Sequence, residues 1–390
     1  MNPYNAGALV AIFALCLLAA AAIAGRSVFY RGQLAAEAGR FESIDGLRGF
    51  LALAVFGEHA MSMHGLLASG RWGAGVEPFF LQASRAGVSI FFMITAFLFW
   101  LRVLRSGDAF ATRPFFLSRI RRLTPMYLVS VLMVLAVAFA ASGLELRVPL
   151  PDLLRELRPW LSFGFMSTGP LNGVQDAHAI NAVYWTLGYE WMFYLALPLL
   201  ALLARGPWSV LPLLAVLYFG GEASMVYNFL FGALAALFVQ RRVLEPGFFL
   251  KAWLAPLPLA ALAAYFAIAG QRHLAESALL FVFFLFVVHG YSLLGVLHTA
   301  PAKLLGMVSY SLYLTHCIVL YVVMHAADRM APIGSLGSAQ YWMLAALAAL
   351  GAVVLSCSTY RYVELPFIHP QARPTTNGRH PWTRRLISGW

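Results

Sequence analysis

A small set of ionisable side chains interrupts long apolar stretches of this sequence, and such groups are costly in lipid and usually functional. They are Glu58, His59, Glu190, His289 and His316, with His64 and Glu364 near the ends of stretches. If the stretches are helices, His59 lies about 15 Å, His316 about 18 Å and Glu190 about 10 Å from a membrane face. All three would fall near the middle of a hydrocarbon core about 30 Å thick. Imidazole and carboxylate groups there are suited to general acid–base catalysis.

A structural role is open for each of these groups. A histidine in a membrane can simply hydrogen-bond a neighbouring helix, and Glu190 could form an ion pair with an arginine near the inner face. Glu58 directly precedes His59, and adjacent residues on a helix do not share a face. We therefore expect the Glu58 carboxylate to point away from the imidazole.

Arginines recur at positions that could hold a phosphorylated molecule. Arg48 and His59 are eleven residues apart, which places them on one helix face about 16 Å apart. Arg119 and Arg122 are three residues apart and also share a face. Guanidinium groups at a helix start suit phosphate, although retention of basic loops at the inner membrane face would also explain them. The pattern suits a donor with a phosphorylated head and a distant reactive end, as in acyl-CoA.

The elements that position these residues are predicted to be membrane helices. Hydrophobic residues make up 61% of the 390 positions and charged residues 11%, whereas soluble domains carry about a quarter charged residues. Several apolar stretches approach the roughly 20 residues that span hydrocarbon. We predict an all-α polytopic membrane protein with spans at about 7–24, 49–66, 86–104, 124–142, 183–204, 208–220, 225–239, 252–269, 277–297, 304–326 and 339–360.

The charge distribution predicts orientation and excludes some partners. With the loop 25–48 in the cytoplasm, twenty of the 27 Lys and Arg residues fall on the cytoplasmic side. This asymmetry places the N-terminus outside and the C-terminus in the cytoplasm. The net charge of +11 therefore points to a lipid bilayer and not to nucleic acid. The long external loop 143–182 could be a lid or an acceptor-binding loop.

The three cysteines lie inside apolar stretches and show no metal-ligand spacing. They are Cys16, Cys317 and Cys357. Because a disulfide framework needs a different pattern, we interpret them as small buried hydrophobic residues. We expect no metal site.

Five segments, in order along the chain, resemble the motifs of the acyltransferase family 3 membrane proteins. They are the R-x10-H motif in Ile44-Asp45-Gly46-Leu47-Arg48-Gly49 with His59, the R-x-x-R segment Arg119 to Arg122, the W-S/T-L-x-x-E motif Trp185 to Glu190, the S-Y-x-x-Y-L-x-H motif Ser309 to His316, and the E-x-P element at Glu364 to Pro366. The family core has ten spans, so the resemblance implies one extra N-terminal transmembrane helix. It divides the chain into that helix (1–30), an acyltransferase-3-like transmembrane domain (41–367) and a basic cytoplasmic tail (368–390).

The resemblance implies a membrane O-acyltransferase of the bacterial cytoplasmic (inner) membrane. Such an enzyme moves an acyl group, commonly acetyl and not aminoacyl, from cytoplasmic acyl-CoA to a hydroxyl on the outer side. The acceptor would be a glycan, as in polysaccharide modification, or a glycosylated small molecule. Direct transfer and transfer through a partner protein are both open.

The resemblance also suggests roles for individual residues. His59 would be the general base or a transient acyl carrier, and Arg48, Arg119 and Arg122 would hold the CoA phosphates. Glu190 would orient His59 or an acceptor hydroxyl, and His316 would stabilise the intermediate or bind acceptor. Substrate contacts are expected from Trp185, Tyr310 and Tyr313, although Trp185 also fits an interfacial aromatic belt and the tyrosines fit polar contacts between helices.

A proton-coupled secondary transporter or flippase is the alternative function. In such a protein the histidines and glutamates near the membrane centre would form a proton relay. Transporters of this kind are often built from inverted repeats, and none is visible in the sequence.

Overall fold

The computed structural model describes residues 6–36, 41–106, 110–203, 224–243, 246–249, 251–268, 270 and 273–368. Within these ranges the chain is helical and forms no β-strand; Leu171 and Val174 make an isolated β-bridge. Six helices in this part of the chain are long and apolar enough to cross a membrane, and three shorter helices are also apolar. The expected all-α polytopic membrane fold is confirmed.

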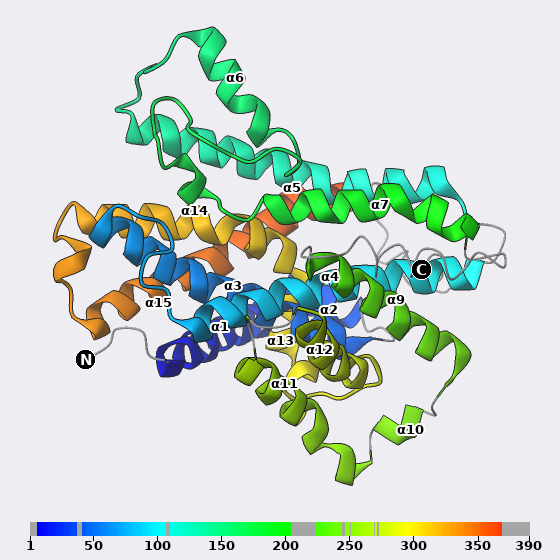
Figure 1. The fold of residues 1–390 in the computed structure, drawn as a ribbon. Helices are drawn as coiled ribbons and strands as arrows, with labels where there is room; N and C mark the ends of the chain where they lie inside the picture. Colours follow the sequence, from blue (N-terminus) through cyan, green and yellow to red (C-terminus); the bar gives the residue numbers. More distant parts are fainter. Residues whose placement is uncertain are drawn as a thin grey trace.

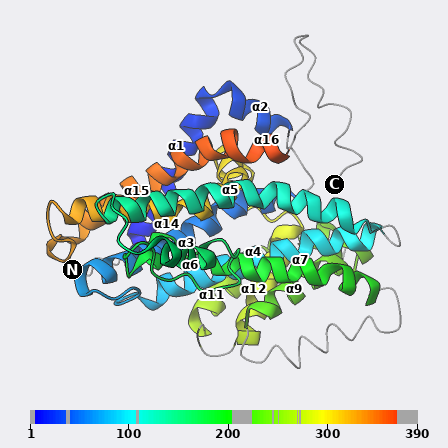
Figure 2. The same ribbon diagram turned by 90° about the horizontal axis from the view of Figure 1, so that it is seen from above.

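The helices run along one another in an elongated bundle (Figures 1 and 2). Their bounds are α1 Ala6–Arg26, α2 Val28–Ala36, α3 Glu42–Ser69, α4 Pro78–Ser106, α5 Thr112–Ala141, α6 Leu150–Trp160, α7 Trp185–Leu203, α9 Ser224–Arg241, α10 Pro246–Phe249, α11 Pro256–Ile268, α12 His273–Val288, α13 Ala300–Met307, α14 Ser309–Asp328, α15 Ser338–Thr359 and α16 Leu365–Ile368. Short 3-10 turns are η2 Ala177–Ile180, η4 Ala252–Leu254, η5 Val296–His298 and η6 Ile333–Ser335, and η7 Tyr360–Glu364 is a π-helix.

Helix α3 lies inside the bundle and contacts α4, α13 and α14. Glycines allow this close packing. A Cβ atom on Gly46 would overlap the backbone of Leu297, and one on Gly49 would overlap Leu305. Gly306 meets the backbone of Asp45 in the same way. Because the two α3 glycines are three residues apart, they form one flat face toward η5 and α13, and Arg48 is directed to another side of the helix.

Several predicted boundaries are corrected by the structure. The span predicted at 277–297 ends at Val288 in α12, where Gly290 adopts a positive φ of 100° that ends the helix. The span predicted at 304–326 is divided at Val308 into α13 and α14. The span predicted at 124–142 begins earlier, because α5 starts at Thr112. The predicted span 208–220 and nearly all of the tail 368–390 lie outside the described residues.

The long loop predicted at 143–182 contains local structure of its own. Helix α6 buries Leu153 and Trp160, and the segment projects from the bundle beside α5 (Figure 1). Asn172 joins the two arms of the loop, since its side chain accepts from the Arg147 N–H and donates to the Glu145 carbonyl. The loop then returns to the bundle through η2, which contacts α5 and α14.

Candidate active site

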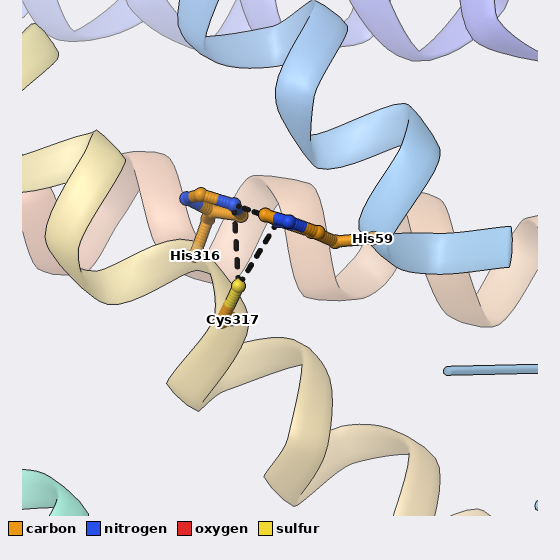
Figure 3. Close-up of side chains that lie close together, drawn as sticks. All are labelled: His59, His316 and Cys317. Carbon is orange, nitrogen blue, oxygen red and sulfur yellow. Dashed lines mark hydrogen bonds between the residues drawn. The ribbon is translucent and has the colours of Figure 1, made fainter. Parts of the chain in front are cut away.

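A pair of histidines from α3 and α14 lies at the centre of the candidate site (Figure 3). Nδ1 of His59 is 2.9 Å from Nε2 of His316, and the two ring planes differ by 12°. Both side chains are buried, with exposed fractions of 7% and 0%. The sequence placed the two histidines at similar depth. The structure brings them into direct contact, although 257 positions separate them.

Hydrogen bonding determines which nitrogens of the pair carry protons. Nδ1 of His316 lies 3.0 Å from the carbonyl of Leu312, which can only accept, so this nitrogen is protonated. In the neutral ring, Nε2 of His316 is therefore an acceptor, and Nδ1 of His59 donates to it. The two rings are therefore joined by one buried hydrogen bond of ordinary length.

Glu58 engages the other nitrogen of His59. Its carboxylate oxygen Oε2 is 3.2 Å from Nε2 of His59, and Ser62 donates to the other carboxylate oxygen over 2.5 Å. The expectation that the Glu58 carboxylate points away from the imidazole is therefore wrong. The two Cβ atoms do leave the helix in different directions, but the longer glutamate side chain bends back to the ring. A carboxylate in this position orients the imidazole and stabilises its protonated form.

Cys317 adds a thiol to the pair. Its sulfur lies 3.1 Å from Nδ1 of His59 and 3.4 Å from Nε2 of His316, and a backbone hydrogen bond from Ala182 reaches it as well. The cysteine is fully buried, as expected, but it is not only a hydrophobic filler. The three donor atoms lie within 4.8 Å of one another, a spacing that could hold a metal ion. The expectation of no metal stays a prediction.

Aromatic side chains cover the histidine pair on the side of the long loop. Trp72, in the turn between α3 and α4, packs against His59 with ring centroids 5.9 Å apart. His178 of η2 packs edge-on against Trp72 at 6.1 Å. Neither residue stands out in the sequence, because each lies in a connection without helical periodicity. Together they form an outer cover of the site.

A cavity of about 140 Å³ lies between α3, α4, α5, α7 and α14. Arg48 and Arg122 line it together with Glu190. The rest of the lining is largely apolar and aromatic and includes Phe91, Phe92, Leu98, Phe99, Tyr194, Tyr310 and Tyr313. Arg48 and Arg122 lie in the N-terminal halves of α3 and α5, so the cavity lies toward the end of the bundle where these two helices start.

The arginines differ in their partners. Arg122 forms an ion pair with the fully buried Glu364 at 3.6 Å, and Ser311 donates to the same carboxylate. This contact gives Glu364 of the E-x-P element a role as the ion-pair partner of Arg122, which the spacing of the motif alone did not suggest. Arg119 stacks over the ring of Phe99 at 4.6 Å, and its buried Nε has no hydrogen-bond partner. Arg119 is thus close to the cavity wall, but it is not among the residues that line the cavity.

The remaining predicted residues occupy separate places. Glu190 accepts a hydrogen bond from Tyr194 and interacts electrostatically with the three arginines, so the structure groups it with the arginine cavity. Tyr310 lines the cavity and donates to the Leu123 carbonyl over 2.8 Å. Trp185 is 43% exposed and packs edge-on against Tyr189.

Tyr313 lies between the cavity and the histidine pair. Its ring lines the cavity and is 6.0 Å from the ring of His316, and its hydroxyl donates to Thr186 over 3.1 Å. The arrangement therefore has an arginine end, a tyrosine boundary, a buried imidazole–thiol cluster and an aromatic outer cover.

Comparisons with known proteins identify the family of the chain. A curated relative, Nodulation protein 10 of Rhizobium leguminosarum bv. viciae, is 31% identical over 173 residues. That alignment covers 42% of this chain and 45% of the relative, so it spans less than half of each. No solved structure matches. The model of acyltransferase family 3, described as an acyltransferase domain, matches residues 41–361. Since this match covers most of the sequence, the chain belongs to the acyltransferase family 3 membrane proteins.

Proposed function

We propose that this multi-pass membrane acyltransferase moves an acetyl group from cytoplasmic acetyl-CoA to a hydroxyl of a glycan or glycosylated small molecule on the outer side. The observation that carries the proposal is the alignment of two sites. An arginine-lined cavity lies between the helices, and a buried histidine pair lies beyond Tyr313 under an aromatic cover. This order matches a donor with a phosphorylated head and a distant thioester.

The arginines would bind the donor. Guanidinium groups form charge-assisted hydrogen bonds with phosphate oxygens, and a largely apolar cavity lowers competition from water. Arg48 and Arg122 line this space, and Arg119 lies beside it. Glu190 then limits the positive charge of the cavity and holds Tyr194 in place through their hydrogen bond.

The histidine pair would move the proton of the acceptor hydroxyl. In the transfer reaction the hydroxyl oxygen forms a bond to the acyl carbon, and the bond from that carbon to the CoA sulfur breaks. His59 takes the hydroxyl proton, Glu58 stabilises the resulting imidazolium, and the proton leaves with the CoA thiol. Trp72 and His178 would border the path of the acceptor and offer aromatic rings to a sugar.

The test uses the purified full-length protein in lipid nanodiscs with acetyl-CoA. The measured quantity is the rate at which the free CoA thiol is released. We expect the variant His59→Ala to lower CoA release by about 10²- to 10⁴-fold. His64→Ala is the matched control, since His64 is on the same helix and packs edge-on against Tyr341. Full activity in His59→Ala would contradict the assigned role of this histidine.

The acceptor class is tested in cells. Mass spectrometry of surface glycans and secreted glycosides should show one acetyl mass lost when the gene is deleted, and restored by wild-type protein but not by His59→Ala. Loss of an acyl mass from lipids alone would contradict a glycan or glycoside acceptor.

A further inference from the structure

The nucleophile available in the buried cluster is a thiol. Cys317 follows His316 on α14, and its sulfur contacts both imidazoles of the pair at 3.1 and 3.4 Å. Cysteine is intrinsically strongly nucleophilic, and an adjacent imidazole that is itself oriented by a carboxylate is the usual way to activate it. Here His59 is next to the sulfur, and Glu58 engages the opposite nitrogen of the same ring. Thiol, imidazole and carboxylate thus follow one another in the order of a catalytic triad.

The imidazoles are less suited to carry an acyl group. Nδ1 of His316 is held by the Leu312 carbonyl, and its Nε2 faces His59. Nε2 of His59 faces Glu58, and its Nδ1 faces His316 and Cys317. Every ring nitrogen of the pair therefore already has a polar partner, and acylation of any of them would break a buried hydrogen bond. Acylation of the sulfur leaves the bond between the two histidines intact.

The sulfur also lies in line with the cavity. On α14, Tyr310 and Tyr313 line the cavity, and Cys317 comes four residues after Tyr313 on the same face. On the opposite wall, Thr186 lines the cavity, and Ala182, whose backbone contacts the sulfur, comes four residues before it. Four residues of helix rise about 6 Å. On α14 the sulfur therefore lies about one helical turn beyond Tyr313, and on the other wall the turn that precedes α7 brings Ala182 to the same sulfur.

From this geometry we propose that Cys317 accepts the acyl group from acyl-CoA and carries it as a thioester before transfer to the acceptor. The proposal rests on the proposed function and adds an intermediate to it. In the first step the Cys317 thiol gives its proton to Nδ1 of His59, while the proton already on Nδ1 passes to Nε2 of His316. The Cys317 sulfur then forms a bond to the acyl carbon, the bond to the CoA sulfur breaks, and the proton passes to the CoA thiolate.

The second step regenerates the thiol. The histidine pair takes the proton of the acceptor hydroxyl, the hydroxyl oxygen bonds to the acyl carbon, and the bond to the Cys317 sulfur breaks. The proton returns to that sulfur. One thioester is exchanged for another and then for an ester, so the two steps need no oxidant, reductant or further co-reactant. It also allows donor and acceptor to occupy the two sides of the cluster at different times.

The experiment measures the acyl-enzyme directly. Full-length protein in nanodiscs is incubated with isotope-labelled acetyl-CoA, acid-quenched and digested with trypsin. The fragment 304–329 contains Cys317 and neither of the other two cysteines. We expect one labelled acetyl group on this fragment, removable by neutral hydroxylamine, in the wild-type protein. The label should disappear in Cys317→Ala and persist in Cys357→Ala, where a cysteine buried in α15 is changed.

The rate of CoA release distinguishes failure of the thioester proposal from failure of the proposed function. We expect Cys317→Ala and the similarly sized Cys317→Ser to release CoA at least about 100-fold and 10-fold more slowly, respectively, on the scale of a lost catalytic group. Release at the wild-type rate in either variant, or a label that persists on the fragment of Cys317→Ala, would overturn the thioester and leave acyl transfer standing. No CoA release from the wild-type protein with any acyl-CoA and native membranes would instead contradict the proposed function.

Metal analysis tests the remaining interpretation of the cluster, which is that it binds a metal ion. Elemental analysis of the purified wild-type protein should give less than about 0.1 transition metal per chain, far below the single ion that the three donors could bind. One tightly bound zinc that is lost in Cys317→Ala would make Cys317 a metal ligand and overturn its role as acyl carrier.

Discussion

At the scale of single residues, the site depends on how buried polar groups satisfy one another. His59 would be an expensive group in lipid if its two nitrogens had no partners. Glu58 and His316 provide them, and Ser62 and the Leu312 carbonyl in turn hold those two residues. This chain of contacts determines the orientation of both rings. The positioning residue that matters most is therefore Glu58, because it engages His59 directly.

Glu58→Gln tests this dependence. The amide retains the shape of the side chain but carries no negative charge to stabilise a protonated His59. We expect CoA release to fall by about 10²-fold while the affinity for acetyl-CoA stays unchanged. Glu145→Gln is the control, because Glu145 is an exposed glutamate paired with Arg147 in the long loop. A change confined to donor affinity would contradict the assigned role.

Arg122→Gln tests donor binding. Loss of a charge-assisted hydrogen bond to phosphate is worth about 1.5–3 kcal/mol, so we expect the KM for acetyl-CoA to rise about 10- to 100-fold. Acetyl-pantetheine lacks the nucleotide phosphates and should show no such loss. The double variant Arg122→Gln with Glu364→Gln removes the buried unpaired carboxylate and separates binding from stability.

Arg121→Gln is the matched control for the arginine prediction. Arg121 is the adjacent arginine of α5, and its side chain is exposed. Its loss should leave the KM for both donors unchanged. An equal rise for acetyl-CoA in both variants would indicate a general charge effect and not a contact with the donor.

At the scale of elements, the closely packed helix α3 contributes residues to both the arginine-lined cavity and the histidine pair. The helix presents glycines to η5 and α13, Arg48 to the cavity and His59 to α14. A rigid helix of 28 residues transmits any displacement at one end to the other. Residues that determine how closely α3 packs therefore also determine the distance between the arginine-lined cavity and the histidine pair.

Substitution of glycine by alanine should have opposite effects at two positions. In Gly49→Ala the new methyl group overlaps Leu305, and overpacking costs about 1–3 kcal/mol, so the melting temperature should fall. Gly25 of α1 has open space around its Cβ position. Gly25→Ala should therefore keep or raise stability by up to about 1 kcal/mol. Thermal unfolding in detergent measures both, and equal shifts would contradict the packing argument.

At the scale of the whole molecule, the proposed donor side and the proposed acceptor side lie toward opposite ends of one bundle. Arg48 and Arg122 line the cavity near the starts of α3 and α5, whereas Trp72 and η2 cover the histidine pair near the end of α3. A buried cluster between two such ends is the arrangement that the proposed transfer from one side of the membrane to the other requires.

Cysteine labelling tests the orientation. The native cysteines are buried, so new exposed cysteines report their own location. In intact cells, a membrane-impermeant maleimide should label Ser335→Cys of η6 and should reach Thr112→Cys at the start of α5 only after permeabilisation. Labelling in the reverse order would contradict an external N-terminus and a cytoplasmic C-terminus.

The local features of this protein could be predicted from its sequence. Apolar stretches interrupted by few charges require membrane helices, because only helices and closed barrels satisfy backbone groups in lipid. The sequence also predicted a similar depth for His59 and His316 and a common helix face for Arg119 and Arg122. Those properties depend only on helical rise and periodicity.

The contacts that make a site were decided by the tertiary structure alone. The pairing of His59 with His316 and Cys317, the cover of Trp72 and His178, and the ion pair of Arg122 with Glu364 all join segments that are distant in sequence. Glu190 shows the converse, because its depth suggested the histidine layer but packing placed it among the arginines. Periodicity determines which face of a helix a residue occupies, whereas helix packing determines which faces meet.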